Sequence, residues 1–324
     1  MDLMNLKKMN KPTSFRLWVY VTGRCNLKCK HCYINSSYLK NEMTLRDLYK
    51  ILEDYIYFLR VLNIKGGLTL TGGEPLIRKD IFKFLEKISQ HREILNFGIL
   101  SNGTLFTKGI VKELKKNHIN GVGLGIEGME KNNDFIRGKG TFKKIVKTAK
   151  MLVESKIPVG FGFTANKLNY KDLPAVVRLA EKIGVSHITA SILVPEGRGK
   201  KMKNFMLSPT ELKDYYKKAN FLSQSLKRKK NGPGMHLTKS LHFLAKESKR
   251  DFICNSLQKG KILSIMPNGD VHPCGFISLN LGNIRERSLI DIYFNSLLVK
   301  LRHSKKLSSQ CGFIRAYCHS NQNY

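Results

Sequence analysis

The period of the hydrophobic pattern changes repeatedly between residues 15 and 194. Short apolar or glycine-rich runs of strand type alternate with segments in which apolar residues recur at helical spacing. The strand-like runs are 17–22, 67–71, 97–100, 122–126, 159–164 and 187–194, and the helical segments are 44–59, 81–88, 111–116, 142–154 and 173–183. This alternation predicts a parallel sheet with right-handed crossover helices.

About six such repeats predict an α/β fold, either an open doubly wound sheet or a partial barrel. In both folds, ligands bind at the carboxyl ends of the strands. Four of the predicted strands end in a polar or glycine-rich turn. These turns are the CxxxCxxC run after the first strand, Gly72-Gly73-Glu74-Pro75, Ser101-Asn102-Gly103 and Glu127-Gly128. We therefore expect one shared site at this edge of the sheet.

Three cysteines, Cys25, Cys29 and Cys32, follow the first predicted strand. Closely spaced cysteines of this kind hold iron–sulfur clusters, and three thiolates leave one iron of a cubane free for another ligand. The alternatives are a zinc site or buried structural thiols. Structural zinc usually has four ligands on paired CxxC-type arms, and here the fourth local ligand is missing. The run therefore favours a cluster.

The other turns carry groups suited to a ligand, and each also has a structural interpretation. The glycines allow close approach of the backbone, and Glu74 is able to hold an ammonium group, although the same residues suit a tight strand-to-helix turn. Ser101 and Asn102 fit ribose hydroxyls, or they start a helix. Glu127 is placed to orient a ribose or a substrate, or it is an exposed acid.

The CxxxCxxC run followed by Gly72-Gly73-Glu74-Pro75 resembles the radical S-adenosylmethionine (radical SAM) enzymes, over residues 15–194. The resemblance implies a partial (β/α)6 barrel at residues 15–200. It implies that the three cysteines hold three irons of a [4Fe-4S] cluster and that the fourth iron binds S-adenosylmethionine (SAM). The implied SAM contacts are His31, Tyr33, Gly72, Gly73, Glu74, Ser101, Asn102, Glu127 and Arg137, with Thr164 and Asn166 as weaker candidates.

The chemistry that the resemblance implies is reductive. One electron from the cluster cleaves SAM into methionine and a 5′-deoxyadenosyl radical, which takes hydrogen from an unreactive C–H bond. The cofactor performs this step, and the protein orients and shields it. A reducing partner such as ferredoxin or flavodoxin is then required.

The C-terminal residues 254–324 resemble the SPASM extension, which binds auxiliary iron–sulfur clusters. Cys254 is followed by a stretch from Gly269 to Cys274 at the spacing of that family. The family pattern then continues CxxCx₅CxxxC, whereas this chain has Cys311-x₆-Cys318. One interpretation is that all four cysteines hold one auxiliary cluster. The alternatives are a truncated or degenerate tail with an incomplete site, or four unrelated reduced thiols. Residues 1–14 are expected to be an N-terminal extension, and residues 201–253 a helical bridge.

The composition adds two constraints. The net charge is +33, from 57 Lys and Arg against 24 Asp and Glu, which suits an anionic partner or a solvated lysine-rich surface. The charge is spread along the chain without interleaved aromatic residues, so we favour the solvated surface and expect no nucleic acid. No apolar run approaches the roughly 20 residues of a membrane span, and no signal peptide is evident. The seven cysteines are an odd number, which suggests reduced thiols and a cytoplasmic protein.

The resemblance favours an enzyme that modifies a peptide or a small-molecule cofactor precursor of a haem- or quinone-type pathway. One alternative is a protein maturase similar to anaerobic sulfatase maturases. Another is a non-catalytic basic metal-binding module for nucleic acid, which is disfavoured because the cysteine spacing and the β/α order agree with each other.

Overall fold

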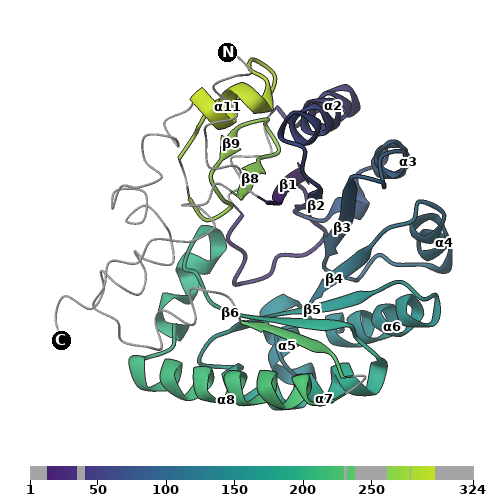
Figure 1. Cartoon of the computed structure of the whole chain (residues 1–324). Coiled ribbons are helices and arrows are strands. Elements are labelled where there is room, and N and C mark those ends of the chain that lie inside the picture. Colours follow the sequence, from purple (N-terminus) through teal and green to yellow (C-terminus); the bar gives the residue numbers. More distant parts are fainter. Residues whose placement is uncertain (1–12, 35–40, 230–231, 238–260, 278, 296–324) are drawn as a thin grey trace.

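The computed structural model describes residues 13–34, 41–229, 232–237, 261–277 and 279–295. Strands and helices alternate through most of this part of the chain, as the hydrophobic pattern predicts (Figure 1). The strands are β1 (Phe15–Thr22), β2 (Gly66–Gly72), β3 (Leu95–Ser101), β4 (Gly121–Gly125), β5 (Val159–Ala165), β6 (His187–Ile192), β7 (Gly234–Leu237), β8 (Ile262–Ile265) and β9 (Val271–His272). The helices are α2 (Leu45–Leu62), α3 (Ile81–Ser89), α4 (Lys108–Lys116), α5 (Glu130–Arg137), α6 (Thr141–Glu154), α7 (Leu173–Ile183), α8 (Pro209–Lys227) and α11 (Leu289–Asn295), with 3-10 turns η2 (Pro75–Ile77), η3 (Tyr170–Asp172) and η4 (Gly197–Phe205).

The described strands form one curved sheet in the order β7-β6-β5-β4-β3-β2-β1-β8-β9. Neighbours from β7 to β8 pair in parallel, and β9 pairs antiparallel with β8. The strands β7 and β9 stand at opposite ends of this order, so the sheet is not closed (Figure 1). The fold is the α/β partial barrel that the sequence predicts, with β1 to β6 as its six repeats.

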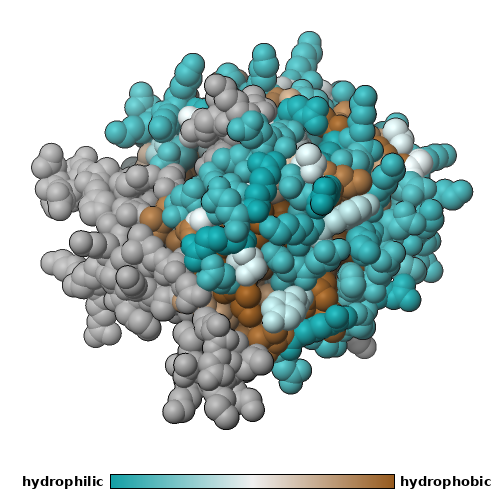
Figure 2. Space-filling model, turned by 90° about the horizontal axis from the view of Figure 1, so that it is seen from above, coloured by the Kyte–Doolittle hydropathy of each residue, from teal (hydrophilic) through white to brown (hydrophobic). Residues whose placement is uncertain are grey.

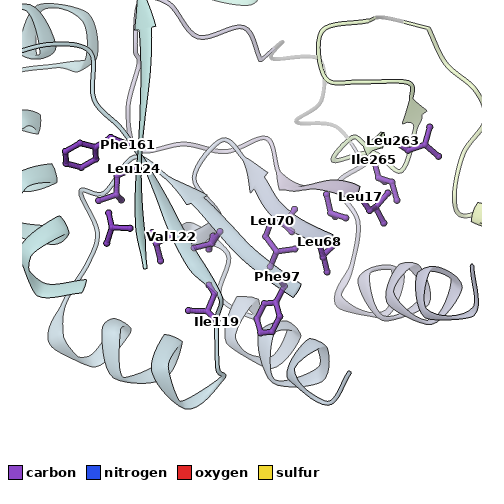
Figure 3. Close-up of a cluster of buried hydrophobic side chains, with 14 of the residues drawn as sticks. Leu17, Leu68, Leu70, Phe97, Ile119, Val122, Leu124, Phe161, Leu263 and Ile265 are labelled. Atoms are coloured by element: carbon purple, nitrogen blue, oxygen red, sulfur yellow. The ribbon is translucent and has the colours of Figure 1, made fainter. Parts of the chain in front are cut away.

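The two faces of the sheet differ in what they bury. Alternate strand residues, among them Leu17, Leu68, Phe97 and Leu124, belong to the hydrophobic layer between the sheet and the helices (Figure 3). The positions between them face the interior of the curve, and on β3 to β6 most of these remain partly exposed. Each fully buried aliphatic or phenyl side chain stabilises the fold by about 1.5–3 kcal/mol. The core therefore lies outside the sheet, which leaves the interior face for other contacts.

Helix α2 shows how local sequence sets an element and how a glycine sets its packing. The Thr44 hydroxyl accepts a hydrogen bond from the Asp47 amide, and the Asp47 carboxylate accepts one from the Thr44 amide. This capping box is the helix start that the sequence predicts. A Cβ on Gly66 would lie 2.5 Å from the Tyr55 hydroxyl, so glycine allows the helix to pack closely on β2.

Helix α5 lies where the sequence pattern predicts no element. It has eight residues, and its buried side chains are Asn133 and Ile136. So few buried positions give almost no periodic signal. The helix nevertheless matters to the site, because it ends at Arg137.

The segment 201–253, expected to be a helical bridge, also contains a strand. Its first part holds the 19-residue helix α8, as the expected bridge requires. The strand β7 follows and pairs in parallel with β6, from His187 with Gly234 to Ala190 with Leu237. Four residues are too few for a strand signal in sequence. Residues 238–253 lie outside the described residues.

The described part of the C-terminal extension continues the sheet beside β1. Strand β8 pairs with β1 from Arg16 with Ile262 to Val19 with Ile265. The Tyr293 ring of α11 lies 5.5 Å from the ring of Phe15, measured between centroids. Arg285 donates to the carbonyls of Asn41 and Glu42 before α2 and pairs with Asp47 in the first turn of α2 at 3.1 Å. The extension thus packs on the strand from which the cysteine loop leaves.

Hydrophilic side chains cover most of the described surface in the view from above, with smaller hydrophobic areas between them (Figure 2). This matches the solvated basic surface expected from the composition. Of the helices in the described ranges, none is long and apolar enough to cross a membrane.

Candidate active site

The loop with the three cysteines leaves β1 and is anchored there by an acid that no motif indicates. Glu42 accepts hydrogen bonds from the Thr22 hydroxyl at 2.8 Å and from the Gly23 amide at 2.6 Å. Its other oxygen lies 3.3 Å from Arg24 Nε. Glu42 therefore fixes the chain immediately before Cys25.

The glycine turn at the end of β2 contacts the same part of the loop. The Gly73 amide donates to the Thr22 carbonyl and the Glu74 amide donates to the Arg24 carbonyl, both at 2.8 Å. A Cβ on Gly73 would lie 2.0 Å from the Arg24 carbonyl oxygen, and Gly72 has a φ of +135°. The close backbone approach that the glycines predict is thus made to the cysteine loop itself.

Glu74 links the ends of β2 and β3. Its carboxylate is fully buried and accepts hydrogen bonds from the Ser101 hydroxyl (2.8 Å), the Asn102 amide (2.8 Å) and the Leu76 amide (3.2 Å). Burial raises the pKa of Glu74, and the hydrogen bonds from Asn102 and Ser101 oppose that rise. In this structure Glu74 positions Ser101 and Asn102, and its expected contact with an ammonium group stays a prediction.

Asn102 extends the network to the first cysteine. Its Nδ2 lies 3.8 Å from Cys25 Sγ and donates to Asn26 Oδ1 at 2.8 Å. The Leu27 amide donates to the same sulfur at 3.4 Å. Hydrogen bonds to sulfur tune the reduction potential of iron–sulfur clusters. Cys25 is therefore surrounded as a ligand is, rather than packed as a core residue.

The three thiols influence one another. Cys29 is buried, Cys25 and Cys32 are half-buried, and none of the three forms a disulfide. Burial raises the pKa of Cys29, Arg137 lowers it, and the charges of Cys32 and Cys25 raise it again. Mutually repelling thiolates are stabilised by a metal centre, and soft thiolate donors suit iron–sulfur clusters. Within the described ranges, no three His, Cys, Asp or Glu side chains are grouped closely enough to hold a metal ion.

Glu127 is the centre of a second network, just beyond β4. Its Oε1 accepts a hydrogen bond from Arg137 at 2.6 Å and lies 3.2 Å from His31 Nε2, and its Oε2 accepts from the Thr164 amide at 2.8 Å. Burial alone would raise the pKa of Glu127, but His31 and Arg137 lower it to about 2. The ionised carboxylate thus holds the cysteine loop, α5 and β5 together. The expected contacts of Glu127 and Arg137 with SAM stay predictions.

Three buried nitrogens at this edge have no hydrogen-bond partner in the structure. They are His31 Nδ1, Arg137 Nε and Asn166 Nδ2. Buried polar groups are nearly always paired, so these atoms indicate hydrogen-bonding groups that a ligand supplies: acceptors for Arg137 and Asn166, and a donor or an acceptor for His31 according to its tautomer. The carboxylate, ribose and adenine of SAM offer such acceptors, and the residues present therefore fit this cofactor.

Tyr33 contacts the C-terminal extension. Its hydroxyl lies 2.9 Å from the Tyr20 hydroxyl, and its ring centroid lies 4.7 Å from that of Phe276. Burial raises the pKa of Tyr33 to about 12. Cys274 lies close enough to add to this rise, while Cys254, Cys311 and Cys318 lie outside the described residues. The predicted contact of Tyr33 with adenine is not tested by these contacts.

The sequence analysis missed the Gly-Arg-Gly turn at residues 197–199, after β6. Arg198 Nε donates to the Cys29 carbonyl at 3.0 Å, and the Gly199 amide donates to the Cys32 carbonyl at 3.2 Å. This turn therefore holds the backbone of the loop at two of the three cysteines. The rule that found the other four turns, a polar or glycine-rich stretch at a strand end, would also have found this one.

Comparison with known families agrees with this geometry. The model of the radical SAM superfamily matches residues 19–180, which is half of the chain. The model of the SPASM iron–sulfur cluster-binding domain matches residues 254–318. The first match contains the three-cysteine loop and both carboxylate networks.

Two relatives from Methanosarcina barkeri are similar in sequence. Fe-coproporphyrin III synthase is 34% identical over 213 residues, which are 64% of this chain and 51% of that protein. The AdoMet-dependent heme synthase is 27% identical over 314 residues, which are 90% of this chain and 86% of that protein. The match thus spans about half the length of the first relative and most of the second.

A solved structure supports the fold. Streptococcus suis SuiB bound to SAM superposes with a TM-score of 0.73 and 20% identity, over 97% of this chain and 74% of that one. At this identity the likeness concerns the fold alone. The loop, the networks and the family matches lead to one conclusion: the chain is an enzyme of the radical SAM superfamily, which uses a [4Fe-4S] cluster and SAM, and it carries a C-terminal SPASM domain.

Proposed function

We propose that the enzyme cleaves SAM reductively at its first cluster in order to modify a haem-type cofactor precursor. The observation that carries this proposal is the agreement between two relatives, at 34% and 27% identity, whose names both place them in haem synthesis. The second alignment spans 90% of the chain, including the SPASM region.

The residues of the site have distinct tasks in this proposal. When bound, the cluster and SAM supply one-electron bond cleavage and hydrogen abstraction. Glu74 holds Asn102 against Cys25, while Glu127 holds Arg137 and His31 with one nitrogen each left for a ligand. The turns at 72–74 and 197–199 each donate hydrogen bonds to the backbone of the loop and hold it in position.

The setting follows from the thiols. Cysteines that hold a cluster must stay reduced, so we place the enzyme in a reducing cytoplasm with ferredoxin or flavodoxin as electron donor. The many basic residues of the chain would attract such acidic partners electrostatically.

The test is an anaerobic turnover assay with reconstituted enzyme, SAM and dithionite. We expect slow formation of 5′-deoxyadenosine without substrate and a clear stimulation by iron-containing coproporphyrin-type tetrapyrroles. Mass spectrometry of the tetrapyrrole identifies the product. If none of these tetrapyrroles changes the rate or is itself changed, the haem-type substrate is wrong.

A peptide substrate is the alternative, and a protein maturase is its variant. The SPASM domain supports it, and the solved structures of SuiB include one bound to its precursor peptide SuiA. The same assay separates the two. Stimulation by a short peptide encoded beside the gene, without an effect of tetrapyrroles, would favour the peptide.

A further inference from the structure

The interior face of the curved sheet is basic. Positions between the core-forming strand residues face the interior, and they include Arg16 and Trp18 on β1, His187 on β6 and His236 on β7. None of the nine described strands contains an Asp or a Glu. Glu127, the acid just beyond β4, is already held by Arg137 and His31. The interior face along the described strands thus carries the Arg16 guanidinium and two imidazoles, with no Asp or Glu on those strands.

Arg16 and His187 both lie on the interior face, on strands that stand five places apart in the sheet. Strands lie about 4.8 Å apart, so a flat sheet would separate these two by roughly 24 Å. That distance exceeds the range of a charge in salt solution, about 8–10 Å. Burial lowers the pKa of His187, and the charges of Arg16 and then His236 lower it further. The β6–β7 register places His236 opposite Thr189, two positions from His187 on the same face, and the effect of Arg16 agrees with a sheet whose curvature brings Arg16 toward this pair.

Glycines on the neighbouring strands make room for these side chains. A Cβ on Gly160 would lie 2.2 Å from His187 Nε2, and one on Gly67 would lie 3.6 Å from Arg16 Nε. Each side chain thus lies over a glycine and stays within the curve of the sheet. A Cβ on Gly162 would meet only a backbone atom, at 4.0 Å, so the wall beside His187 is open.

Trp18 supplies an independent indication of a ligand. Its Nε1 is buried and has no hydrogen-bond partner. A buried indole N–H usually finds an acceptor. Trp18 is two positions along β1 from Arg16 and on the same face, so the acceptor that it lacks would lie in a cationic environment.

We propose that Arg16, His187 and His236 form a carboxylate-binding subsite inside the barrel, with Trp18 Nε1 as a further donor. This subsite holds an acidic side group of the substrate, and the proposal rests on the proposed function because it concerns the same substrate. A guanidinium binds a carboxylate through two parallel N–H groups, which gives both strength and orientation.

The position of the subsite limits the size of the substrate. Arg16 precedes the end of β1 at Thr22 by roughly 20 Å of strand. The subsite therefore holds a part of the substrate that is distant from the cysteine edge. A wide ring with several carboxylates, such as a haem precursor, supplies the charge and extends from the subsite toward the cysteine edge.

Trp18 is the only tryptophan of the chain, so its fluorescence in the anaerobic holoenzyme reports on this subsite. The probes are coproporphyrin III, a tetracarboxylate, and its tetramethyl ester, which has the same ring without the charges. We expect the acid to quench the fluorescence of Trp18 and to bind at least about tenfold more tightly than the ester. A tenfold difference is the usual effect of one charge-assisted hydrogen bond.

Matched variants locate the effect. Arg16→Gln and His187→Gln should each weaken binding of the acid by about tenfold and barely change binding of the ester. Arg16→Lys keeps the charge but lacks the two parallel N–H groups of the guanidinium. It should therefore lose less affinity for the acid than Arg16→Gln does. Lys144→Gln removes one exposed charge on α6 and should change neither affinity. Circular dichroism and iron content check that each variant folds.

The outcomes separate the subsite from the substrate. Equal binding of acid and ester, or equal binding by Arg16→Gln and Lys144→Gln, overturns the subsite and leaves the proposed function standing. If neither porphyrin binds, but citrate shifts Trp18 emission in the wild type and not in Arg16→Gln, the subsite stands and the haem-type substrate is wrong. If citrate and coproporphyrin III both leave the emission unchanged, the subsite is overturned. Inorganic phosphate that displaces coproporphyrin III at lower concentration than citrate would overturn the choice of a carboxylate.

Discussion

At the scale of single residues, the most informative contact is the one between Glu127 and Arg137. Both side chains are largely buried, and the ion pair spans only 2.6 Å. Removing one partner of a buried pair typically costs about 3–5 kcal/mol, because the other charge is left without compensation. This pair therefore contributes to folding as well as to the shape of the cofactor site.

Glu127→Gln tests this dual role through pH. The folded-state pKa of Glu127, about 2, lies below the ordinary value of 4.5. Its contribution to stability is therefore complete above pH 4.5 and is lost as the pH falls towards 2, by about 3 kcal/mol in total. Urea unfolding of cluster-free protein at several pH values should show this loss in the wild type and not in Glu127→Gln.

The matched control for that experiment is Glu130→Gln, which removes an exposed carboxylate paired with Lys143. It should keep the pH dependence of the wild type. If Glu127→Gln keeps it too, the ionised state of Glu127 does not stabilise the fold.

Cys29→Ala tests the first cluster. Cys29 is the most buried of the three cysteines in the loop, and its removal leaves two ligands. Reconstituted protein should lose about four irons per chain and should form no 5′-deoxyadenosine with SAM and dithionite. Undiminished cleavage by this variant would remove the assignment of the cysteine loop.

At the scale of elements, the site depends on two strand ends that meet without side chains between them. The Gly73 turn of β2 lies directly against the loop that leaves β1, and both backbone amides of that turn are used in the contact. The geometry of the cysteine loop is therefore set by the backbone of a different element.

Gly73→Ala should displace the loop, because the new methyl group would lie 2.0 Å from the Arg24 carbonyl. We expect the iron at the first site to fall from about four to less than about one per chain. Gly109→Ala in α4 is the control, since its Cβ would meet nothing closer than 3.7 Å, and it should load iron normally. Iron analysis and visible absorption measure the iron content of both variants. A normal iron content of Gly73→Ala would contradict the proposed contact.

The elements that the sequence predicts are those whose signal is local. Helix α2 has eight buried residues at regular spacing and a capping box, so its start at Thr44 follows from neighbouring residues. The turns at Gly72 and Glu127 follow from the rule that parallel strands end at one edge. Their convergence is predictable because it requires only the order of strands and helices.

The elements that sequence reasoning missed depend on distant partners. Strand β7 exists because β6 offers an edge, and β8 exists because β1 does. Glu42 has its function only because β1 ends beside it. From sequence alone, an ion pair between Arg137 and Glu127 could not be distinguished from separate contacts of each residue with the ligand. Both alternatives require the same residues at the same edge of the sheet.

At the scale of the whole molecule, the SPASM domain and the radical SAM core share one sheet. Through β8 the extension lies beside β1, and through Phe276 it touches Tyr33 next to the cysteine loop. Cys274 therefore belongs to the same folded unit as the cysteine loop, and a change in the extension is expected to act on the core.

Cys274→Ala tests the second group of cysteines. A chain that holds a second cluster should bind about eight irons, and the variant about four, with SAM cleavage retained because the first site is intact. Iron and sulfide analysis of both proteins is the measurement. A wild type with only four irons would favour an incomplete auxiliary site.

The place of β8 beside β1 has a consequence for biosynthesis. The ribosome makes β1 before β8, and the strands β2 to β7 with their helices lie between them in the sequence, so one edge of β1 waits without its neighbour until β8 has been made. Unpaired strand edges invite association with other chains. Metal loading should therefore follow release of the finished polypeptide, and nascent chains that stop before Ile262 should be colourless and aggregate.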